Sequence, residues 1–356
     1  MGTMIDTKIQ FEEIGPIGNG EGLNSNVFLA KDVQLGTELV IKKIAKESLE
    51  KQKLKTDEFF LEAKALYASK SPYIMEIQYA SQDDENIYLA MPFLSSGSLN
   101  SKMNAEYLTV REIIKYSVDI LTGLNVIHSK GLIHLDIKPT NILIDESGKA
   151  IITDFGLARF LDENGFAEQG YNYVLHRDPE AFYYNKRSIY SDIYQFGVTL
   201  YRMCNGNDVL QKQVVNMKIN NDNIGDFIVN GKFPVRNSYL PHIPKRLQKI
   251  VEKCLSVDIK KRYSNVLDIM NDINSINENL DWRFHPNSQY IYEKQCDNNK
   301  KILVGIENKG TSYNVLCIRS DESGKTTRKM NNYCLSDVRS LREVEIQLMN
   351  IFKNIH

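Results

Sequence analysis

The sequence has few cysteines, and they are not arranged in pairs. The five cysteines are scattered, without a C-x-x-C spacing: Cys204, Cys254, Cys296, Cys317 and Cys334. A disulfide framework needs paired cysteines, and a structural zinc site needs closely spaced ligands. The pattern disfavours both, and we expect these side chains to be ordinary core or surface residues of a protein in a reducing compartment.

Long apolar runs and an excess of charge of one sign are also missing. No stretch approaches the roughly 18 apolar residues that a membrane-spanning helix requires. Lys+Arg 44 against Asp+Glu 45 leave a net charge of -1, so no overall charge draws the chain toward nucleic acid or an acidic membrane. Residues 1–11 lack the apolar core of a signal peptide. We therefore expect a cytoplasmic protein with no nucleic-acid partner and no membrane partner.

Length and periodicity indicate more than one structural unit. The chain has 356 residues, 42% of them hydrophobic, and domains of on the order of 150 residues give two or three units. Apolar spacing predicts strands over 27–30, 39–41 and 87–91, and helices over 56–69, 108–131, 191–203, 247–255 and 264–273. After a polar linker at 274–279, alternating segments and a helix over 340–355 predict a small β-rich unit closed by a helix.

The most informative stretch is His134-Leu-Asp-Ile-Lys-Pro-Thr-Asn141, followed by Asp154-Phe-Gly156. A carboxylate such as Asp136 can orient a hydroxyl and accept its proton, and Lys138 can neutralise charge on a phosphoryl group. Asn141 and Asp154 offer hard oxygens of the kind that Mg²⁺ binds together with nucleotide phosphates. These residue types predict transfer of a phosphoryl group from ATP to a hydroxyl.

From about residue 11 to 273, these motifs make the sequence resemble the eukaryotic-type (Hanks-type) serine/threonine protein kinase family. The resemblance implies a bilobal α+β fold. Residues 1–91 would form a β-rich upper lobe, 92–278 the hinge and a helical lower lobe, and 279–356 a C-terminal domain of unknown role. It also implies ATP and Mg²⁺ as cofactors, catalytic roles for Asp136 and Lys138, and metal binding by Asn141 and Asp154.

The same resemblance assigns a nucleotide site. The residues concerned are Gly20, Gly22, Ser25, Val27, Val40, Lys42, Glu62, Met91, Pro92, Leu94 and Leu143. Ser25 replaces the third glycine of a glycine-rich loop, and Glu62 would pair with Lys42. Lys42 is preferred over Lys43 as the phosphate-binding lysine because strand alternation puts the two side chains on opposite faces.

Downstream, the resemblance implies three supporting roles. Glu180 and Arg262 would tie the activation segment (residues 154–180) to the lower lobe, and Asp192 would hold the catalytic loop. Asp178 replaces the alanine usual before Pro-Glu. We expect His134 to be structural and packed beside Phe155, because Asp136 already fills the role of base.

Some residues depart from the family pattern. Leu135 stands where many relatives have an arginine that grips a phosphate on the activation segment, and residues 154–180 contain no Ser or Thr. Their hydroxyl-bearing residues are Tyr171 and Tyr173. We therefore hypothesise a segment held by packing, with no need for Ser/Thr phosphorylation. Tyr173 and His176 replace a usual threonine and tyrosine near the acceptor site, which puts peptide selectivity in question.

Two other function classes stay open. A pseudokinase that serves as a binding scaffold is disfavoured because every metal-binding and base residue is present. A small-molecule phosphotransferase is disfavoured because residues 178–192 match the family's peptide platform.

Ser25 could be a self-phosphorylated off-switch, although a small residue tolerated in the loop is the preferred interpretation. Composition indicates a bacterial stand-alone kinase with protein substrates, whose C-terminal domain either docks a partner or is a structural appendage.

Overall fold

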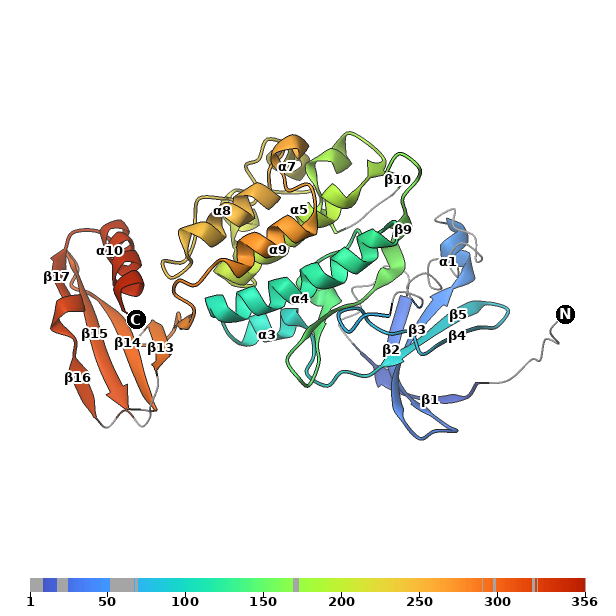
Figure 1. The fold of residues 1–356 in the computed structure, drawn as a ribbon, viewed down its shortest axis with the longest axis horizontal. Helices are drawn as coiled ribbons and strands as arrows, with labels where there is room; N and C mark the ends of the chain where they lie inside the picture. Colours follow the sequence, from blue (N-terminus) through green and yellow to red (C-terminus); the bar gives the residue numbers. More distant parts are fainter. Residues whose placement is uncertain are drawn as a thin grey trace.

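The computed structural model describes residues 9–17, 25–51, 67, 70–168, 173–289, 291–296, 299–321, 324 and 326–355. Figure 1 shows three parts along the long axis: an N-terminal sheet, a helical middle part, and a C-terminal sheet with one helix. The first two are the lobes of the expected bilobal α+β fold, which is confirmed. In the part of the chain that the structure describes, no helix is both long enough and apolar enough to cross a lipid bilayer.

The upper lobe is a five-stranded antiparallel sheet in the order β1-β2-β3-β5-β4. Its elements are β1 Phe11–Pro16, β2 Ser25–Asp32, β3 Glu38–Ala45, α1 Lys46–Lys51, β4 Tyr79–Gln82 and β5 Asn86–Pro92. In β3, Leu39 and Ile41 are buried in one apolar cluster, whereas Val40 and Lys42 on the other face are half-buried. Because side chains alternate along a strand, the second face is left to line a site between the lobes.

The lower lobe is built from helices and three short strand pairs. The helices are α3 Leu99–Ala105, α4 Val110–Ser129, α5 Ile189–Asn205, α6 Val209–Asn216, α7 Ile224–Val229, α8 Lys245–Cys254 and α9 Val266–Asn274. The strand pairs are β6 Leu132–Ile133 with β9 Arg159–Phe160, β7 Ile142–Ile144 with β8 Ala150–Ile152, and β10 Ala167–Glu168 with β11 Lys186–Arg187.

Helix α4 has clear start and stop signals. Thr109 and Glu112 form a capping box in which each side chain accepts a hydrogen bond from the other residue's backbone N–H, at 3.2 and 2.9 Å. The helix ends two residues before Gly131, which has φ +70°, a conformation that glycine adopts without strain. The helix therefore ends just before β6 begins and delivers the chain to the loop that contains Asp136.

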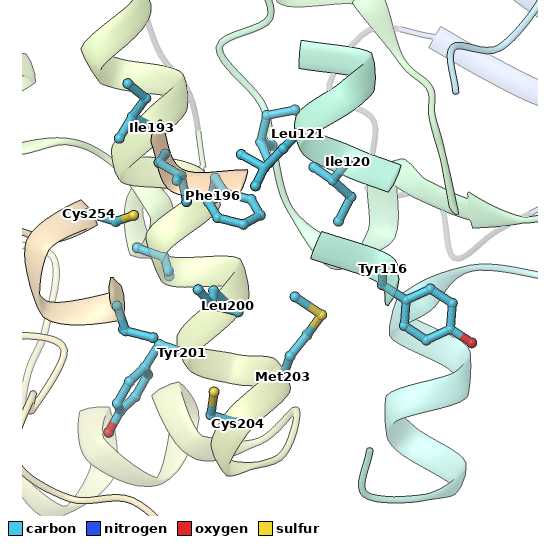
Figure 2. Close-up of a cluster of buried hydrophobic side chains, with 14 of the residues drawn as sticks. Tyr116, Ile120, Leu121, Ile193, Phe196, Leu200, Tyr201, Met203, Cys204 and Cys254 are labelled. Atoms are coloured by element: carbon cyan, nitrogen blue, oxygen red, sulfur yellow. The ribbon is translucent and has the colours of Figure 1, made fainter. Parts of the chain in front are cut away.

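The core of the lower lobe lies between α4, α5, α8 and α9. Figure 2 shows Ile120 and Leu121 of α4 pointing toward Phe196 of α5, and all three side chains are fully buried. On the other side of α5, Gly197 permits close contact with α8, since a Cβ there would lie 2.7 Å from the Cys254 Cβ. Helix α5 is thus fixed from both sides, and this rigidity extends to the polar side chains it carries.

The C-terminal domain is a six-stranded sheet packed against one helix. Strand order is β12-β13-β14-β15-β16, with β17 also paired to β15. The elements are β12 Trp282–Phe284, β13 Tyr292–Cys296, β14 Lys300–Asn308, β15 Tyr313–Asp321, β16 Thr327–Lys329, β17 Leu335–Val338 and α10 Leu341–Asn354. The core of this domain begins at Trp282 and shares no residue with that of the lower lobe, which extends to Ile276. The predicted boundary near residue 279 lies between these two sets of buried residues and stays a prediction.

Arg283 attaches the C-terminal domain to the turn between α3 and α4. Its guanidinium forms ion pairs with Glu106 and, at 3.0 Å, with Glu112, and it donates to the Tyr107 carbonyl at 2.8 Å. Tyr107 also packs edge-on against Phe284, with ring centroids 4.9 Å apart. Figure 1 shows the C-terminal sheet and α10 at the opposite end of the lower lobe from the upper-lobe sheet.

Most long elements agree with the sequence-based expectations. Strands β2, β3 and β5, helices α4, α5, α8, α9 and α10, and the β-rich tail lie where they are predicted. The predicted helix over 56–69 lies almost entirely outside the described residues. Sequence periodicity missed many short elements, among them α1, α3, α6, α7, β12, β16 and β17. Each of these has fewer than nine residues, too few to establish a period.

Candidate active site

Asp136 lies in a group of polar side chains in the loop after β6. Its Oδ2 accepts a hydrogen bond from Asn141 Nδ2 at 2.7 Å and lies 2.9 Å from Lys138 Nζ. Asn141 Nδ2 also donates to the Asp136 carbonyl at 3.0 Å. Asp136 is only 7% exposed, so its carboxylate has little freedom to rotate. Three of the predicted catalytic and metal-binding residues are therefore in direct contact.

His134 supports this loop as a neutral ring. It is fully buried and packs against Phe155 with ring centroids 4.8 Å apart. Nδ1 accepts the Asp136 N–H at 3.2 Å, so Nε2 carries the proton and donates to the Thr153 carbonyl at 3.1 Å. Burial lowers the pKa of His134. With both nitrogens occupied, His134 is structural, as the sequence predicts.

Asp192 on α5 holds the backbone of the catalytic loop. Leu135 has φ +66°, a left-handed conformation that costs a non-glycine residue about 1–2 kcal/mol. The Asp192 carboxylate accepts the N–H groups of His134 and Leu135 at 2.9 and 2.7 Å. Its burial opposes ionisation, but a 2.8 Å hydrogen bond with His128 and these donors lower the pKa of Asp192. The charged carboxylate thus stabilises a loop conformation that is strained by itself.

An ion pair between Lys42 and Asp154 joins β3 to the loop that begins the activation segment. Partial burial of Asp154 opposes its ionisation, but the Lys42 ammonium lowers the pKa of this carboxyl to about 2. Lys43, the neighbouring candidate, instead lies over the Tyr88 ring, 6.0 Å from its centroid. The expectation that strand alternation separates the two lysines is confirmed.

Gly156 leaves room for this ion pair. A Cβ at residue 156 would lie 3.2 Å from Lys42 Nζ and 3.3 Å from Asp154 Oδ1. Asp154 itself has φ +63°, and its Oδ1 accepts the Gly156 N–H at 3.4 Å. A side chain at residue 156 would therefore crowd both charged groups.

Asn141 and Asp154 are brought together by the β7–β8 pair. Ile142 pairs with Ile152, and one step further the Thr153 N–H donates to the Asn141 carbonyl at 2.9 Å. Asp154 follows directly, so the two predicted metal ligands lie at the same end of this short ladder. The Asn141 Oδ1 is contacted by Thr140 Oγ1 at 3.5 Å, the outer limit of a hydrogen bond. This amide oxygen and the Asp154 carboxylate are both available to a cation.

The predicted nucleotide-site residues that the structure describes lie on neighbouring strands. Val27 of β2 pairs with Lys42, and Val40 of β3 pairs with Met91 of β5. All four side chains are half-buried and belong to the face of the sheet that carries Lys42.

The structure also places three further predicted residues, whereas others lie outside the described residues. Pro92 ends β5, Leu94 follows it in the connector, and Leu143 belongs to β7, where it forms a bridge with Ser98. Gly20, Gly22 and Glu62 lie outside the described residues, as does Tyr171. Ser25 is the first residue of β2, and the structure describes its backbone only.

The activation segment is fixed at its C-terminal end. The carboxylate of Glu180 forms a two-pronged ion pair with the fully buried guanidinium of Arg262, at 2.7 and 3.1 Å. Asp178 is fully buried, accepts a hydrogen bond from Ser191 Oγ at 3.0 Å, and lies 3.7 Å from Arg187 Nε. Burial and the nearby Glu180 raise the pKa of Asp178 to about 6.

Sequence patterns missed two polar residues of α5. Gln195 accepts the Ile137 N–H at 2.9 Å and donates to the Leu135 carbonyl at 2.8 Å, so it clamps both peptides that flank Asp136. Thr199 Oγ1, one turn further along α5, donates to the Ile137 carbonyl at 3.2 Å. The available signal was a glutamine and a threonine inside an otherwise apolar helix, because buried polar groups require partners.

Comparison with known proteins identifies the family. The protein kinase domain family matches residues 11–274, which is most of the chain. The protein named probable serine/threonine-protein kinase PknB, from Lactococcus lactis, is 27% identical over 316 residues, covering 87% of this chain and 48% of that protein. Serine/threonine-protein kinase PknD from Protochlamydia amoebophila is 27% identical over 286 residues, covering 71% and 29%. Human ribosomal protein S6 kinase alpha-3 is 30% identical over 205 residues, covering 55% and 27%.

The chain spans less than half the length of each of these relatives. The family match nevertheless covers both lobes and every described residue of the site between them. The chain belongs to the protein kinase domain family.

Proposed function

We propose that this chain is a serine/threonine protein kinase that transfers the γ-phosphoryl group of ATP to hydroxyls of protein substrates in a Mg²⁺-dependent reaction. One observation carries the proposal. Asp136 contacts both Lys138 and Asn141, and Asn141 is tied through Thr153 to the ionised Asp154. A hydroxyl-orienting carboxylate, a cation and two hard oxygen ligands are the groups that phosphoryl transfer requires.

The described residues offer Mg²⁺ a few oxygen ligands and leave its other positions to nucleotide phosphates. They include no group of three or more His, Cys, Asp or Glu side chains that could hold a metal without further ligands. They do offer the Asp154 carboxylate and the Asn141 Oδ1, and Mg²⁺ commonly combines such oxygens with nucleotide phosphates. When bound, the ion would neutralise charge on the phosphates.

The residues of the chain itself divide the remaining tasks. The Asp136 carboxylate orients the acceptor hydroxyl and takes its proton as the oxygen bonds to the γ-phosphorus and the bond to the ADP oxygen breaks. Lys138 lies beside this carboxylate and can stabilise charge on the transferred group. Lys42 extends from the upper lobe to the same end of the site, where it can contact the phosphates while it holds Asp154.

The test is phosphate transfer from radiolabelled ATP to dephosphorylated casein by the full chain. We expect incorporation into serine and threonine, loss of incorporation to background when EDTA removes Mg²⁺, and recovery when Mg²⁺ is added back in excess. Label on tyrosine alone would contradict the proposed acceptor, and transfer undiminished in EDTA would contradict the metal dependence. ATP bound without any transfer would favour the scaffold alternative.

The position of Leu135 supports a second proposal, that the kinase needs no Ser/Thr phosphorylation on its activation segment. Leu135 is fully buried in a cluster with Ile133 and Ala167, against which Leu157 and Leu161 also pack. Three of these residues belong to the activation segment, so apolar contacts join the segment to the catalytic loop. An arginine at residue 135 would use a phosphate for this purpose, whereas the leucine uses burial.

This proposal predicts that unphosphorylated enzyme is active. Chain made by cell-free synthesis and treated with phosphatase should transfer phosphate without a lag, because the segment is already packed in place. Intact-mass measurement before and during the assay checks that residues 154–180 carry no phosphate. A lag that ends only when Tyr171 or Tyr173 becomes phosphorylated would contradict it.

Other expectations stay predictions. A cytoplasmic location was inferred from sequence, and the structure adds only the absence of a spanning helix among the described residues. Docking of a partner by the C-terminal domain is also untested, and its place far from the upper lobe suits a role outside the chemical step (Figure 1).

A further inference from the structure

Two residues that depart from the family pattern, Tyr173 and His176, lie against the catalytic loop on the side of Lys138. Tyr173 precedes the 3-10 turn Val174–His176, and its ring contacts the His176 ring at a centroid distance of 5.7 Å and a tilt of 40°. The Lys138 ammonium lies 5.4 Å from the centroid of the Tyr173 ring. Tyr173 therefore touches both the cation of the site and a buried histidine.

His176 forms a fixed base for Tyr173. It is 2% exposed, and its Nε2 accepts a hydrogen bond from Arg202 Nη1 at 3.1 Å. Nδ1 must then carry the proton, which it donates to the Ile137 carbonyl at 3.1 Å. Burial and the Arg202 charge lower the pKa of His176 well below its ordinary value, so the ring stays neutral.

Both backbone polar groups of Ile137, its carbonyl and its N–H, are hydrogen-bonded to His176 or to side chains of α5. Its carbonyl also accepts Thr199 Oγ1 at 3.2 Å, and its N–H donates to Gln195 at 2.9 Å. Ile137 lies between Asp136 and Lys138 in sequence. The backbone from which Lys138 extends is therefore rigid, and what remains to be set is the direction of the Lys138 side chain.

The Tyr173 ring can set that direction without competing for hydrogen bonds. An ammonium has three N–H donors, and Lys138 uses one toward Asp136 Oδ2 at 2.9 Å. A second carboxylate or hydroxyl in this place would take another donor, whereas an aromatic face attracts the positive charge through its quadrupole. The Lys138 side chain is 19% exposed, and such partial desolvation strengthens this attraction.

We propose that Tyr173, supported by His176, is a positioning residue that holds the Lys138 ammonium by a cation–π contact beside Asp136 and keeps its remaining N–H groups available to the transferred phosphoryl group. The proposal deepens the proposed function and rests on it. It also explains why both departures occur together, since His176 provides the surface on which the Tyr173 ring rests. Tyr173 is 41% exposed, so solvent reaches one part of its ring while His176 and Lys138 contact another.

The decisive comparison is between Tyr173→Leu and Tyr173→Phe. Loss of the ring should lower kcat by about three- to thirty-fold at saturating ATP and casein, with KM for both substrates little changed, because the contact acts on the transferred group. The phenylalanine variant should retain most of kcat. Tyr67→Leu is the matched control, since Tyr67 is an exposed tyrosine whose ring lies 5.9 Å from Lys70 Nζ, away from Lys138, and it should keep the wild-type kcat.

A double-mutant cycle with Lys138→Met separates this role from others. Tyr173→Leu should have little further effect once Lys138 is gone. Additive losses would overturn the proposal. So would a rise in KM for casein alone, which indicates peptide binding, or equal losses in the leucine and phenylalanine variants, which indicate that the hydroxyl matters.

A measurement that does not need activity distinguishes failure of this inference from failure of the proposed function. The Tyr173 ring should shift the NMR signals of the Lys138 ε-methylene protons upfield, and the shift should persist in Tyr173→Phe and vanish in Tyr173→Leu. That pattern supports the contact even if the wild type transfers no phosphate. Signals unchanged by Tyr173→Leu would overturn it even if the enzyme is active.

Discussion

Asp136→Asn should lower kcat for phosphoryl transfer by about 10²- to 10⁴-fold, the usual loss when a general base is removed. An asparagine has the same shape, and its side-chain oxygen can still accept the hydrogen bond that Asn141 donates at 2.7 Å. It cannot accept the proton of a substrate hydroxyl. The loss should therefore appear in kcat, while nucleotide affinity and melting temperature stay close to those of the wild type.

The control is Asp84→Asn, the same chemical change at an exposed turn of the upper lobe, which should leave kcat unchanged. Initial rates with casein, nucleotide titration and thermal melts of the three proteins make the comparison. An Asp136→Asn variant as active as the wild type would remove Asp136 from the mechanism. Equally negligible turnover in both would favour a pseudokinase scaffold.

Motif order predicted which residues meet, because the chemistry restricts residue types strongly. The family motif indicated Lys42 and strand alternation set Lys43 apart from it; the structure shows Lys42 paired with Asp154 while Lys43 lies over Tyr88. The structural role of His134 followed from the fact that Asp136 already supplies a base. In each case the family motif supplied the candidates, and a local rule, alternation or chemical role, decided between them.

The supports of the catalytic loop could not be predicted in the same way. Gln195 and Thr199 meet a loop that lies about 60 residues earlier, as their sequence separations of 58, 60 and 62 show. Helical periodicity marks this stretch of α5 as buried, but it cannot say which backbone groups a buried glutamine will meet. Asp178 is similar, since its contact with Ser191 depends on how the activation segment returns to α5.

The same limit applies to the C-terminal domain. Alternating segments predicted its strands, yet strand order, register and attachment depend on contacts distant in sequence. Arg283 reaches Glu106 and Glu112, which lie 177 and 171 residues earlier. Glu106 also forms an ion pair with Lys102 of α3, and Glu112 caps the N-terminus of α4. Nothing in the local pattern around Arg283 distinguishes it from an ordinary surface arginine.

Glu180→Ala should destabilise the lower lobe by about 3–5 kcal/mol, because it leaves a buried guanidinium without its counter-charge. Arg262 is fully buried at its side chain, and Glu180 is 11% exposed. The carbonyls of Ser256 and Tyr190 would still accept hydrogen bonds from Arg262, but neither carries a charge. For a lobe of this size the loss corresponds to a fall in melting temperature of roughly 10 °C.

Glu278→Ala provides the matched control. Glu278 pairs with Arg246 at 3.7 Å, but the two side chains are 38% and 61% exposed. Water screens such a pair, so its removal should cost about 1 kcal/mol or less. Differential scanning calorimetry of the two variants separates the effect of burial from that of simply deleting a glutamate. Similar melting temperatures for both variants would show that the Glu180 contact contributes no more than a surface pair.

A double variant shows whether the loss arises from an unpaired charge or from the contact itself. Arg262→Met removes the guanidinium and leaves the Glu180 carboxylate without its partner, so it should also be strongly destabilising. With Glu180→Ala and Arg262→Met combined, no unpaired charge remains, and the total loss should be clearly smaller than the sum of the two single losses. Strict additivity would mean that the residues act independently. The expected coupling would instead show that Glu180 fixes the end of the activation segment by neutralising Arg262, which supports a segment that needs no phosphate to stay in place.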